Sequence, residues 1–526
     1  MTTNTELEIK FIFDAAVAQS LAREGYSPLL EKNSQVLRAT YFDTPQGDLA
    51  QAHVALRVRH ADQGYVQTVK AQGGAALERW QHEQGVAGPL PERRALPPAS
   101  TALGDLLHGQ FDALEAQFSV RFRRSVWRIQ AAPLLVLEIS VDQGELRAKP
   151  GTRKAPIAEL EIECIRGTRL AFLRWATQFA VRHQLRLLQD SKQEQGLRLL
   201  GRLPAVPPPA LRARSALRDS FSAGQACAVA LQADVMHLLA NAAALRSGQE
   251  PEAVHQLHIA MQRLRATVRA FGLSSHGRSW RALLAQAHAL ARTAGQARDA
   301  DVFATQSLPA VRESFGAEPA LQAFADLVAT QRALCTQRCQ QAFGGPAVTA
   351  FALTLLCQSE RVAQRSAKGP CAKAKANTGL TLRMPVRPFL QIQLRHLARR
   401  MRRRIRQAHS PKGWHRARLA VKRLRYTLEL AWPTLGAAKR HARILQLLTK
   451  LQQDLGEMND QTMACRTARR IVALADTAQR QAADCVRAIA LVDAWSAQNA
   501  TPVTLALVSV QKTCRRLERW WRKRQP

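Results

Sequence analysis

Short stretches in which apolar and polar residues alternate dominate the first 200 residues. They read "ELEIKF" (6–11), "ALRVRH" (55–60), "YVQTVKA" (65–71), "FSVRFRRSVWRI" (118–129), "LLVLEISVDQGEL" (134–146) and "AELEIECI" (158–165). Successive side chains of a strand point to opposite faces, so each stretch predicts a strand with one polar and one apolar face. Turn-rich segments separate the stretches, which favours antiparallel pairing. Two longer segments, about 13–25 and 167–188, predict helices.

The pattern changes after a proline-rich segment, "GRLPAVPPPALRAR" (201–214). Four prolines within six residues predict a stiff linker. Beyond it the chain is rich in Ala, Leu, Arg and Gln at helical spacing, which predicts an all-α region. A second break, at about 366–388, divides this region in two.

The two halves of the helical region resemble each other. "HQLHIAMQRLRATV" (255–268) parallels "HRARLAVKRLRYTL" (415–428), and "GQARDADVF" (295–303) parallels "GEMNDQTMA" (456–464). The offsets are about 160 residues for both pairs, which predicts an internal duplication. The predicted organisation is an α+β chain with a strand-rich domain at 1–202, a linker at 203–218 and a helical domain at 219–526, with halves at about 219–365 and 389–526.

Charge is spread unevenly along the chain. The formal net charge is +36, yet residues 1–200 hold 25 basic and 22 acidic residues. The remaining residues hold 51 basic and 18 acidic residues. A surplus of this size predicts a polyanionic partner for the helical domain, with a merely solvated basic surface as the alternative.

Cysteine usage and hydropathy indicate the compartment. The nine cysteines are an odd number without CxxC pairs, which predicts reduced thiols in a cytoplasmic protein. The first residues show no signal peptide pattern, and the apolar stretch at 503–510 is too short to span a bilayer. We therefore expect no membrane partner.

The polar faces of the predicted strands carry clustered charges. "ELEIKF" places Glu6, Glu8 and Lys10 on one face, and other strands pair Arg57 with Arg59 in the same way. Any one such face could simply be solvated. Several faces dominated by one sign of charge make a poor surface, because neighbouring like charges repel. A closed barrel would turn these faces inward, where carboxylates suit Mg²⁺ or Mn²⁺ and basic groups suit phosphate.

"ELEIK" resembles the ExExK signature of the CYTH superfamily, the triphosphate tunnel metalloenzymes. The order of later motifs is also similar: "ALRVR", "TVK", an Arg-x-x-x-Glu strand, "RFRR", "EISVDQGE", "ELEIE" and "DSKQEQG". The resemblance covers nearly all of residues 4–200. It implies an antiparallel eight-stranded tunnel that acts on triphosphates with Mg²⁺ or Mn²⁺.

The resemblance also implies roles for individual residues. The implied metal ligands are Glu6, Glu8, Glu161 and Glu163. The implied phosphate-binding residues are Lys10, Arg57, Arg59, Lys70, Arg79, Arg121, Arg123 and Lys192. The implied catalytic set is Glu6, Glu8, Lys10, Glu83 and Asp142. Gln81 departs from the family pattern, in which a carboxylate is usual, so metal stoichiometry or rate could differ.

A basic stripe is predicted on one helix of each helical half, because positions i, i+3, i+7 and i+10 share a face. "HRARLAVKRLRY" resembles the signature of CHAD domains, conserved-histidine α-helical domains associated with inorganic polyphosphate, and "HQLHIAMQRLR" matches less well. The implied polyphosphate-binding residues are His255, His258, Arg265, His415, Arg418, Lys422, Arg423 and Arg425. Asp299, Asp301 and Asp460 fit an accompanying acidic motif that could hold Arg side chains in place.

The favoured function is metal-dependent hydrolysis of inorganic triphosphate in the tunnel, with polyphosphate binding by the helical domain. The alternatives are a non-catalytic polyphosphate-binding or granule-associated protein, and thiamine triphosphatase or adenylate cyclase activity. Nucleic-acid binding is a further alternative, because Trp520 and Trp521 could stack on bases. No helix-turn-helix, zinc or RNP-type pattern supports it, so no specific nucleic-acid partner is expected.

Overall fold

The chain divides into two compact units. In the computed structural model, the first unit comprises residues 1–208 with 344–360, and the second comprises 209–343 with 361–526. The described residues are 2–13, 17, 29–61, 64–72, 77–148, 153–188, 190–211, 217–246, 248, 251–273, 277–366, 381–435, 438–474, 483–499, 512–513 and 515–516. Each unit is described by itself.

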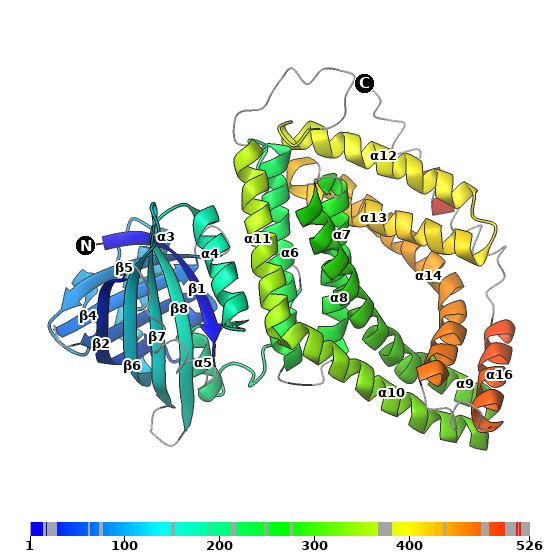
Figure 1. Cartoon of the computed structure of the whole chain (residues 1–526), viewed down its shortest axis with the longest axis horizontal. Coiled ribbons are helices and arrows are strands. Elements are labelled where there is room, and N and C mark those ends of the chain that lie inside the picture. The colour runs from blue at the N-terminus through cyan, green and yellow to red at the C-terminus, as the bar shows by residue number, and fades with distance from the viewer. Residues whose placement is uncertain are drawn as a thin grey trace. The chain divides into compact units, whose positions relative to one another are not determined.

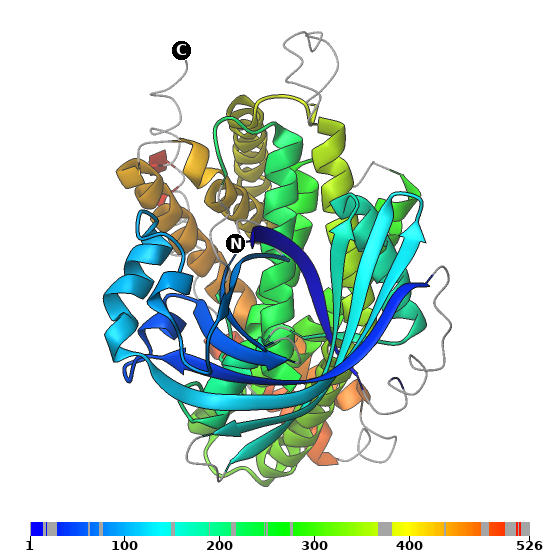
Figure 2. The same ribbon diagram turned by 90° about the vertical axis from the view of Figure 1, so that its left-hand side faces the viewer.

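Eight antiparallel strands close into a barrel in the first unit, as predicted (Figures 1 and 2). The strands are β1 (Thr2–Ile12), β2 (Leu29–Asp43), β3 (Val54–Ala61), β4 (Gly64–Gln72), β5 (Glu78–Val86), β6 (Glu115–Ala132), β7 (Leu135–Ala148) and β8 (Lys154–Arg166). The neighbour order is β5-β4-β3-β2-β6-β7-β8-β1, and β1 also pairs with β5. This double pairing of β1 closes the ring.

Helices cover much of the outer face of the barrel. Leu56 and Val58 of β3 pack outward against Leu49 of α2 (Asp48–Gln51) and Leu107 of α3 (Ala102–Gln110). Ile9 of β1 is buried on the same outward side, near α4 (Arg169–Arg182), which contacts β8. Helix α4 confirms most of the helix predicted at 167–188, whereas the helix predicted at 13–25 lies outside the described residues except for position 17.

A short helix, α5 (Lys192–Leu199), fills one end of the barrel. Phe118, Val120 and Phe122 of β6 point inward there and form a core with Leu37 and Leu146, against which Leu199 and Leu200 pack. The close approach requires glycine at position 196, since a Cβ atom there would lie 2.3 Å from Cζ of Phe118. An apolar cluster therefore packs against α5 inside the barrel.

Residues 344–360, which the sequence places in the helical domain, group with the barrel unit. They form the first part of α11 (Pro346–Ser366). Thr349 Oγ1 accepts a hydrogen bond from the backbone N–H of Leu187 in β9 (Arg186–Leu187) at 3.0 Å. Arg169 of α4 contacts Glu78 at 2.5 Å and Glu360 at 3.6 Å. Polar contacts of this kind account for the grouping.

The second unit is helical and its elements repeat. The helices are α6 (Ala223–Arg246), α7 (Pro251–Ala270), α8 (Arg278–Val302), α9 (Leu308–Phe315), α10 (Pro319–Gly344), the end of α11, α12 (Val386–Arg406), α13 (Pro411–Leu435), α14 (Ala438–Leu474) and α16 (Ala483–Gln498). Helices α7 and α13 begin 160 residues apart, as do α8 and α14. Helices α7 and α13 contact each other, and so do α6 and α12. The bounds of the described helices therefore repeat at the offset seen in the sequence motifs.

Helix α6 has the length and mean hydropathy of a membrane span. However, 72% of its most apolar window is buried inside the structure, which is the environment of a core helix. The described residues of the predicted linker, 203–211 and 217–218, contain no helix or strand.

We expect Gly196→Ala to destabilise the barrel unit by about 1–3 kcal/mol, because Phe118 is fully buried and stacks on Tyr41 at 4.7 Å between ring centroids. Gly109→Ala in α3 is the control, since a Cβ atom there has no neighbour within 4 Å. The measurement is urea unfolding followed by pulse hydrogen exchange of β6 peptides. Equal stability of the two variants would contradict the tight packing of α5.

Candidate functional site

The barrel encloses a polar cavity of about 260 Å³. Its charged lining residues are Glu6, Glu8, Lys10, Arg57, Arg59, Lys70, Arg79, Glu83, Arg124, Glu138, Glu161, Glu163 and Lys192. This volume lies at the small end of ligand sites, which suits a compact ligand. The cavity therefore contains most of the side chains that the sequence predicts to line a tunnel.

Strand register places acidic and basic residues on neighbouring parts of the wall. Glu8 lies opposite Glu163 across the β1–β8 pair, and Glu163 lies opposite Glu138 across the β8–β7 pair. On the other side of β1, Glu6 lies opposite Arg79 of β5. Strand β1 thus separates a carboxylate-rich wall from a wall that carries the basic residues of β3, β4 and β5.

Ion pairs cross the boundary between the two walls. Lys70 Nζ donates to Glu6 Oε2 at 2.8 Å, and Arg79 Nε lies 2.8 Å from Glu8 Oε1. Arg57 and Arg59 also line the basic wall, and the pKa of Arg59 is lowered to about 10 by burial and then by Arg57. Two buried guanidinium groups that repel each other favour an anion between them.

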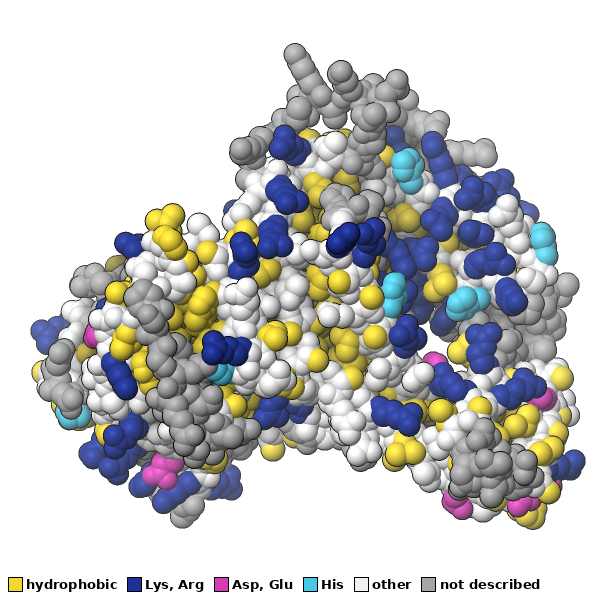
Figure 3. Space-filling model, in the orientation of Figure 1, with side chains coloured by type: hydrophobic (Ala, Val, Ile, Leu, Met, Phe, Trp, Pro, Cys, Tyr) yellow, Lys and Arg dark blue, Asp and Glu magenta, His cyan; other side chains and the backbone are white. Residues whose placement is uncertain are grey.

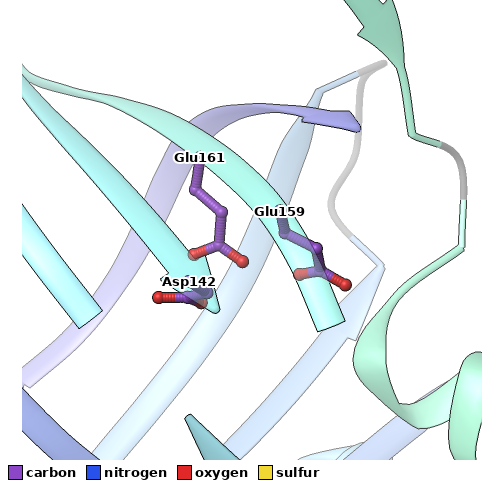
Figure 4. A group of neighbouring side chains, drawn as sticks. All are labelled: Asp142, Glu159 and Glu161. Carbon is purple, nitrogen blue, oxygen red and sulfur yellow. The ribbon is translucent and has the colours of Figure 1, made fainter. Parts of the chain in front are cut away.

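Three carboxylates, those of Asp142, Glu159 and Glu161, gather near the α5 end (Figure 4). Their oxygens lie within 4.8 Å of one another, so the cluster could hold a cation. Lys192 already supplies one, because its Nζ lies 2.8 Å from Asp142, 2.5 Å from Glu159 and 3.0 Å from Glu161. Burial alone would lower the pKa of Lys192, but these carboxylates raise it well above its usual value. A metal ion here would have to displace this ammonium group.

The position of Lys192 follows from a capping box at the start of α5. Ser191 Oγ accepts a hydrogen bond from the Glu194 N–H at 3.2 Å, and Glu194 Oε2 accepts one from the Ser191 N–H at 2.7 Å. The hydroxyl of Ser191 also donates to Glu194 at 2.8 Å. Ser191 is thus a helix cap, as expected of a turn residue.

Arg121 and Arg123 are not in the lumen, so the prediction that they line it is wrong. Both are exposed on the outer face of β6, and Arg124 points inward instead. Arg124 makes two bonds of 2.7 Å to Asp142 and one of 2.8 Å to Glu161. The apolar residues Phe118, Val120 and Phe122 face inward at this end of β6. Arg124 lies two residues beyond Phe122, so it faces inward as well.

Glu138 is a second lumen residue that the sequence interpretation missed. It shares one face of β7 with Asp142, and the alternation in "VLEISVD" contains the signal, because Leu137, Ile139 and Val141 point outward. Its carboxylate accepts a bond from Arg128 at 2.9 Å.

Glu163 is the lumen carboxylate least neutralised by cations, and it lies beside Glu8 and Glu138, which have cationic partners. Glu8 Oε1 is buried and makes no hydrogen bond among the described residues, but Arg79 lies 2.8 Å from it. Burial alone would raise the pKa of Glu8, but Lys10, Lys70 and Arg79 lower it. Burial, followed by the charges of Glu6 and Glu138, raises the pKa of Glu163 to about 7. The undercompensated carboxylate of Glu163, beside a Glu8 oxygen that makes no hydrogen bond among the described residues, fits a hard divalent cation that prefers oxygen ligands. These residues therefore fit Mg²⁺ or Mn²⁺.

Glu161 differs from the other predicted metal ligands. Lys10, Arg124 and Lys192 all lie within 3.0 Å of its carboxylate oxygens. Burial alone would raise the pKa of Glu161, but these cations hold it well below its usual value. Its carboxylate is therefore the centre of a structural ion-pair network.

Two further residues line the wall on β5. Glu83 accepts a hydrogen bond from Thr68 at 2.9 Å and lies 3.7 Å from Arg59. Gln81 lies opposite Lys70, and its Oε1 is buried with no hydrogen-bond partner among the described residues. The amide at position 81 thus leaves the basic wall with one carboxylate fewer than the family pattern.

In the helical unit, Gln262 of α7 contacts Lys422 of α13, which occupies the equivalent position in the second half. Gln262 Oε1 accepts hydrogen bonds from Lys422 Nζ and Tyr426 Oη, each at 3.2 Å. His258 also contacts Gln262, and burial followed by Lys422 lowers the pKa of His258 to about 4. A second lysine at position 262 would repel the first, so the neutral amide lets the two basic helices meet.

A second group of cations lies on α7, α12 and α13. Burial, followed by the charge of Arg423, lowers the pKa of Arg265. Burial, followed by Arg269 and Arg400, lowers the pKa of Arg423 itself. We call Arg265, Arg269, Arg400, Arg404 and Arg423 the arginine cluster. No described carboxylate forms an ion pair with any of them. Lys and Arg side chains gather over this part of the surface in Figure 3. Such an array is suited to a polyanion.

Arg425, another residue of the basic stripes, has structural partners. Arg425 lies 3.7 Å from Glu429 and over the ring of Tyr426. The residues of the acidic motif pair with cations that lie outside the basic stripes. Asp301 pairs with Arg298 and Arg332, and Asp299 pairs with Arg470. The side chain of Asp460 lies outside the described residues, as do Trp520 and Trp521.

A closed barrel with an ionic lumen, on one chain with a duplicated basic helical unit, defines a two-domain tunnel protein. Residues 4–197 match the family model of the CYTH domain, and residues 229–469 match that of the CHAD domain. The chain is therefore a protein that joins a CYTH domain to a CHAD domain.

Similar proteins match different parts of the chain. An inorganic triphosphatase of Haemophilus influenzae is 27% identical over 162 residues, which are 30% of this chain and 44% of that protein. The chain thus matches less than half of the length of this curated relative. A CHAD domain from the plant Ricinus communis is 24% identical with a TM-score of 0.49 and covers 59% of this chain and 96% of that one. A putative adenylyl cyclase from Hippeastrum, described as having a dominant triphosphatase activity, is 19% identical with a TM-score of 0.28 and covers 38% and 98%.

We expect Glu163→Gln to remove a pH dependence of stability in metal-free buffer. The pKa of Glu163 is about 7 in the folded chain and near 4.5 when unfolded, so the folded state loses stability as pH rises through this range. The variant should match the wild type at pH 4.5 and exceed it by up to about 3 kcal/mol at pH 8.

The measurement is urea unfolding in EDTA, followed through peptides of β1 and β8 by pulse hydrogen exchange. A stability difference that stays constant between pH 4.5 and 8 would show that Glu163 does not sit among uncompensated carboxylates.

Proposed function

We propose that the tunnel hydrolyses inorganic triphosphate to diphosphate and phosphate with Mg²⁺ or Mn²⁺. The observation that carries the proposal is the juxtaposition of the carboxylates of Glu8, Glu138 and Glu163 with the basic wall formed by Arg57, Arg59, Lys70 and Arg79. The similarity to an inorganic triphosphatase supports it. The small cavity favours an inorganic chain over a nucleotide, whose base and sugar need further room.

Different residues of the lumen would have different roles in the reaction. Arg57, Arg59, Lys70 and Arg79 would bind phosphate oxygens and keep the chain extended along the basic wall. Glu8, Glu138 and Glu163 would hold the metal ion, whose charge, when bound, offsets that of the transferring phosphoryl group. Glu83 faces the same cavity and can accept a proton from the attacking water. Lys10, Lys192 and Arg124 keep the carboxylates near the α5 end in place.

We further propose that the helical domain binds linear polyphosphate through the arginine cluster and the basic stripes of α7 and α13. Polyphosphate carries about one charge per phosphate and no bases, so charge density is the feature to be recognised. The cluster offers guanidinium groups that have no described acidic partner, and a polyanion would relieve their mutual repulsion. A cytoplasmic location remains a prediction.

We expect the full-length protein to release phosphate from tripolyphosphate faster than from thiamine triphosphate, ATP or long-chain polyphosphate when these are compared with Mg²⁺ and with Mn²⁺. The double variant Glu6→Gln/Glu8→Gln should lose at least about 100-fold in kcat/KM. Mn²⁺ binding, followed by electron paramagnetic resonance, should weaken in parallel.

The control is Arg121→Ala/Arg123→Ala, which removes two charges outside the lumen and should keep kcat/KM within about twofold. Purified wild-type protein that releases no phosphate would refute the enzyme and favour a non-catalytic polyphosphate-binding protein. A preference for ATP would point to a nucleotide reaction instead.

For the helical domain, we expect Arg265→Ala/Arg269→Ala/Arg423→Ala to weaken binding of long-chain polyphosphate at least tenfold and to flatten its salt dependence. The matched control is Arg312→Ala/Arg469→Ala/Arg487→Ala, because these side chains already bond Gln322, Asp493 and Glu318. Fluorescence anisotropy over a salt series measures both effects. Equal losses in the two variants would mean that only net charge matters.

A further inference from the structure

The outer face of the barrel carries a second group of cations that neither the lumen nor the helical domain uses. The group consists of Arg38 on β2, Arg121 and Arg123 on β6, Arg147 on β7 and Lys154 on β8, all exposed. We call this group the outer basic face. Lys and Arg side chains are visible at the lower end of the barrel unit in Figure 3.

Strand register brings these five residues together. Arg38 lies directly opposite Arg121 across the β2–β6 pair, and Arg147 lies opposite Lys154 across the β7–β8 pair. Arg123 is two positions along β6 from Arg121, so both point to the same side. Neighbouring strands lie about 4.8 Å apart, so these cationic side chains form a continuous patch across four strands.

The charges of the outer basic face are poorly compensated. Like charges directly opposite each other on a sheet are unfavourable, and both of these cross-strand pairs have like charge. Glu145, the residue opposite Arg121 on β7, bonds Arg147. No described carboxylate forms an ion pair with Arg38, Arg121 or Arg123. Five cations therefore share one carboxylate, in a domain whose net charge is otherwise small.

We propose that the outer basic face is a docking site for linear polyphosphate, separate from the tunnel and from the helical domain. The patch runs across strands on the convex side of the barrel, so it can hold a chain longer than the cavity admits. Each neutralised phosphate would release a counterion, which makes binding favourable and dependent on salt. The inference goes beyond the proposed function, and binding here does not require that the tunnel be catalytic.

The composition of the face favours polyphosphate over nucleic acid. Besides Glu145, the side chains opposite or between the cations are those of Val36, Thr40, Ser119 and Gln143. None of these four has a ring on which a base could stack, and stacking is a main source of affinity for single strands. A chain of phosphates without bases requires only the cations.

Arginine footprinting of the full-length protein tests the proposal. The protein is treated with phenylglyoxal alone, with tripolyphosphate or with long-chain polyphosphate, and modification is quantified by mass spectrometry. Long-chain polyphosphate should slow modification of Arg38, Arg121 and Arg123 at least threefold, whereas tripolyphosphate should not. Arg166, Arg174 and Arg186, which are exposed on β8, α4 and β9, are internal controls whose rates should not change.

A matched pair of variants gives a second readout. Arg38→Ala/Arg121→Ala/Arg123→Ala should weaken long-chain binding about 3- to 10-fold and lower its salt slope by up to about 2, while Arg166→Ala/Arg174→Ala/Arg186→Ala should change neither. Both should keep the tripolyphosphate hydrolysis of the wild type. Absence of protection, equal protection of the control arginines, or equal protection by DNA at matched salt would overturn the proposal. If the wild type hydrolyses no triphosphate, the proposed enzyme fails, yet the footprint still decides this inference.

Discussion

The double pairing of β1 is the constraint on which the tunnel depends. Because β1 bonds to β5 on one side and to β8 on the other, the sheet has no free edge there and every second side chain faces a closed lumen. Charges that an open sheet would leave in water are then buried together. A buried charge without a partner is costly, so the lumen can exist only if acidic and basic groups compensate each other or a ligand does so. Most pairs are complete, as at Lys192, and Glu163 is the incomplete remainder.

That remainder links structure to chemistry. At the α5 end, Lys192 and Arg124 neutralise Asp142, Glu159 and Glu161. This network holds the side chains at that end of the cavity in place. Around Glu163, burial and the charges of Glu6 and Glu138 leave the carboxylate undercompensated, which favours the binding of a divalent ion. On the neighbouring wall, Arg57 and Arg59 repel each other, which is the condition for binding an anion. A metal ion would neutralise the carboxylate wall, and a short phosphate chain would neutralise the arginine wall. The proposed reaction depends on both.

Much of this arrangement was predictable from alternation along the strands. Glu6, Glu8 and Lys10, with Arg57, Arg59 and Lys70, have the side-chain directions that period two gives them. The error at Arg121 and Arg123 has a physical cause. The prediction places the charged face of this strand inward and its apolar face outward, whereas Phe118 and Phe122 face inward because α5 fills that end of the barrel. Packing of a helix remote in sequence decides this register, and local pattern contains no information about it. The surplus negative charge near Glu163 likewise depends on contacts among three strands, which only the fold brings together.

The central claim is that the metal ion binds at the carboxylates of Glu8, Glu138 and Glu163. A crystal structure with Mn²⁺ and a non-hydrolysable imidotriphosphate, with anomalous scattering recorded at the manganese edge, tests it most directly. The account predicts an anomalous peak bordered by these three carboxylates, with the phosphate chain against Arg57 and Arg59. A peak among Asp142, Glu159 and Glu161, with Lys192 displaced from them, would contradict it.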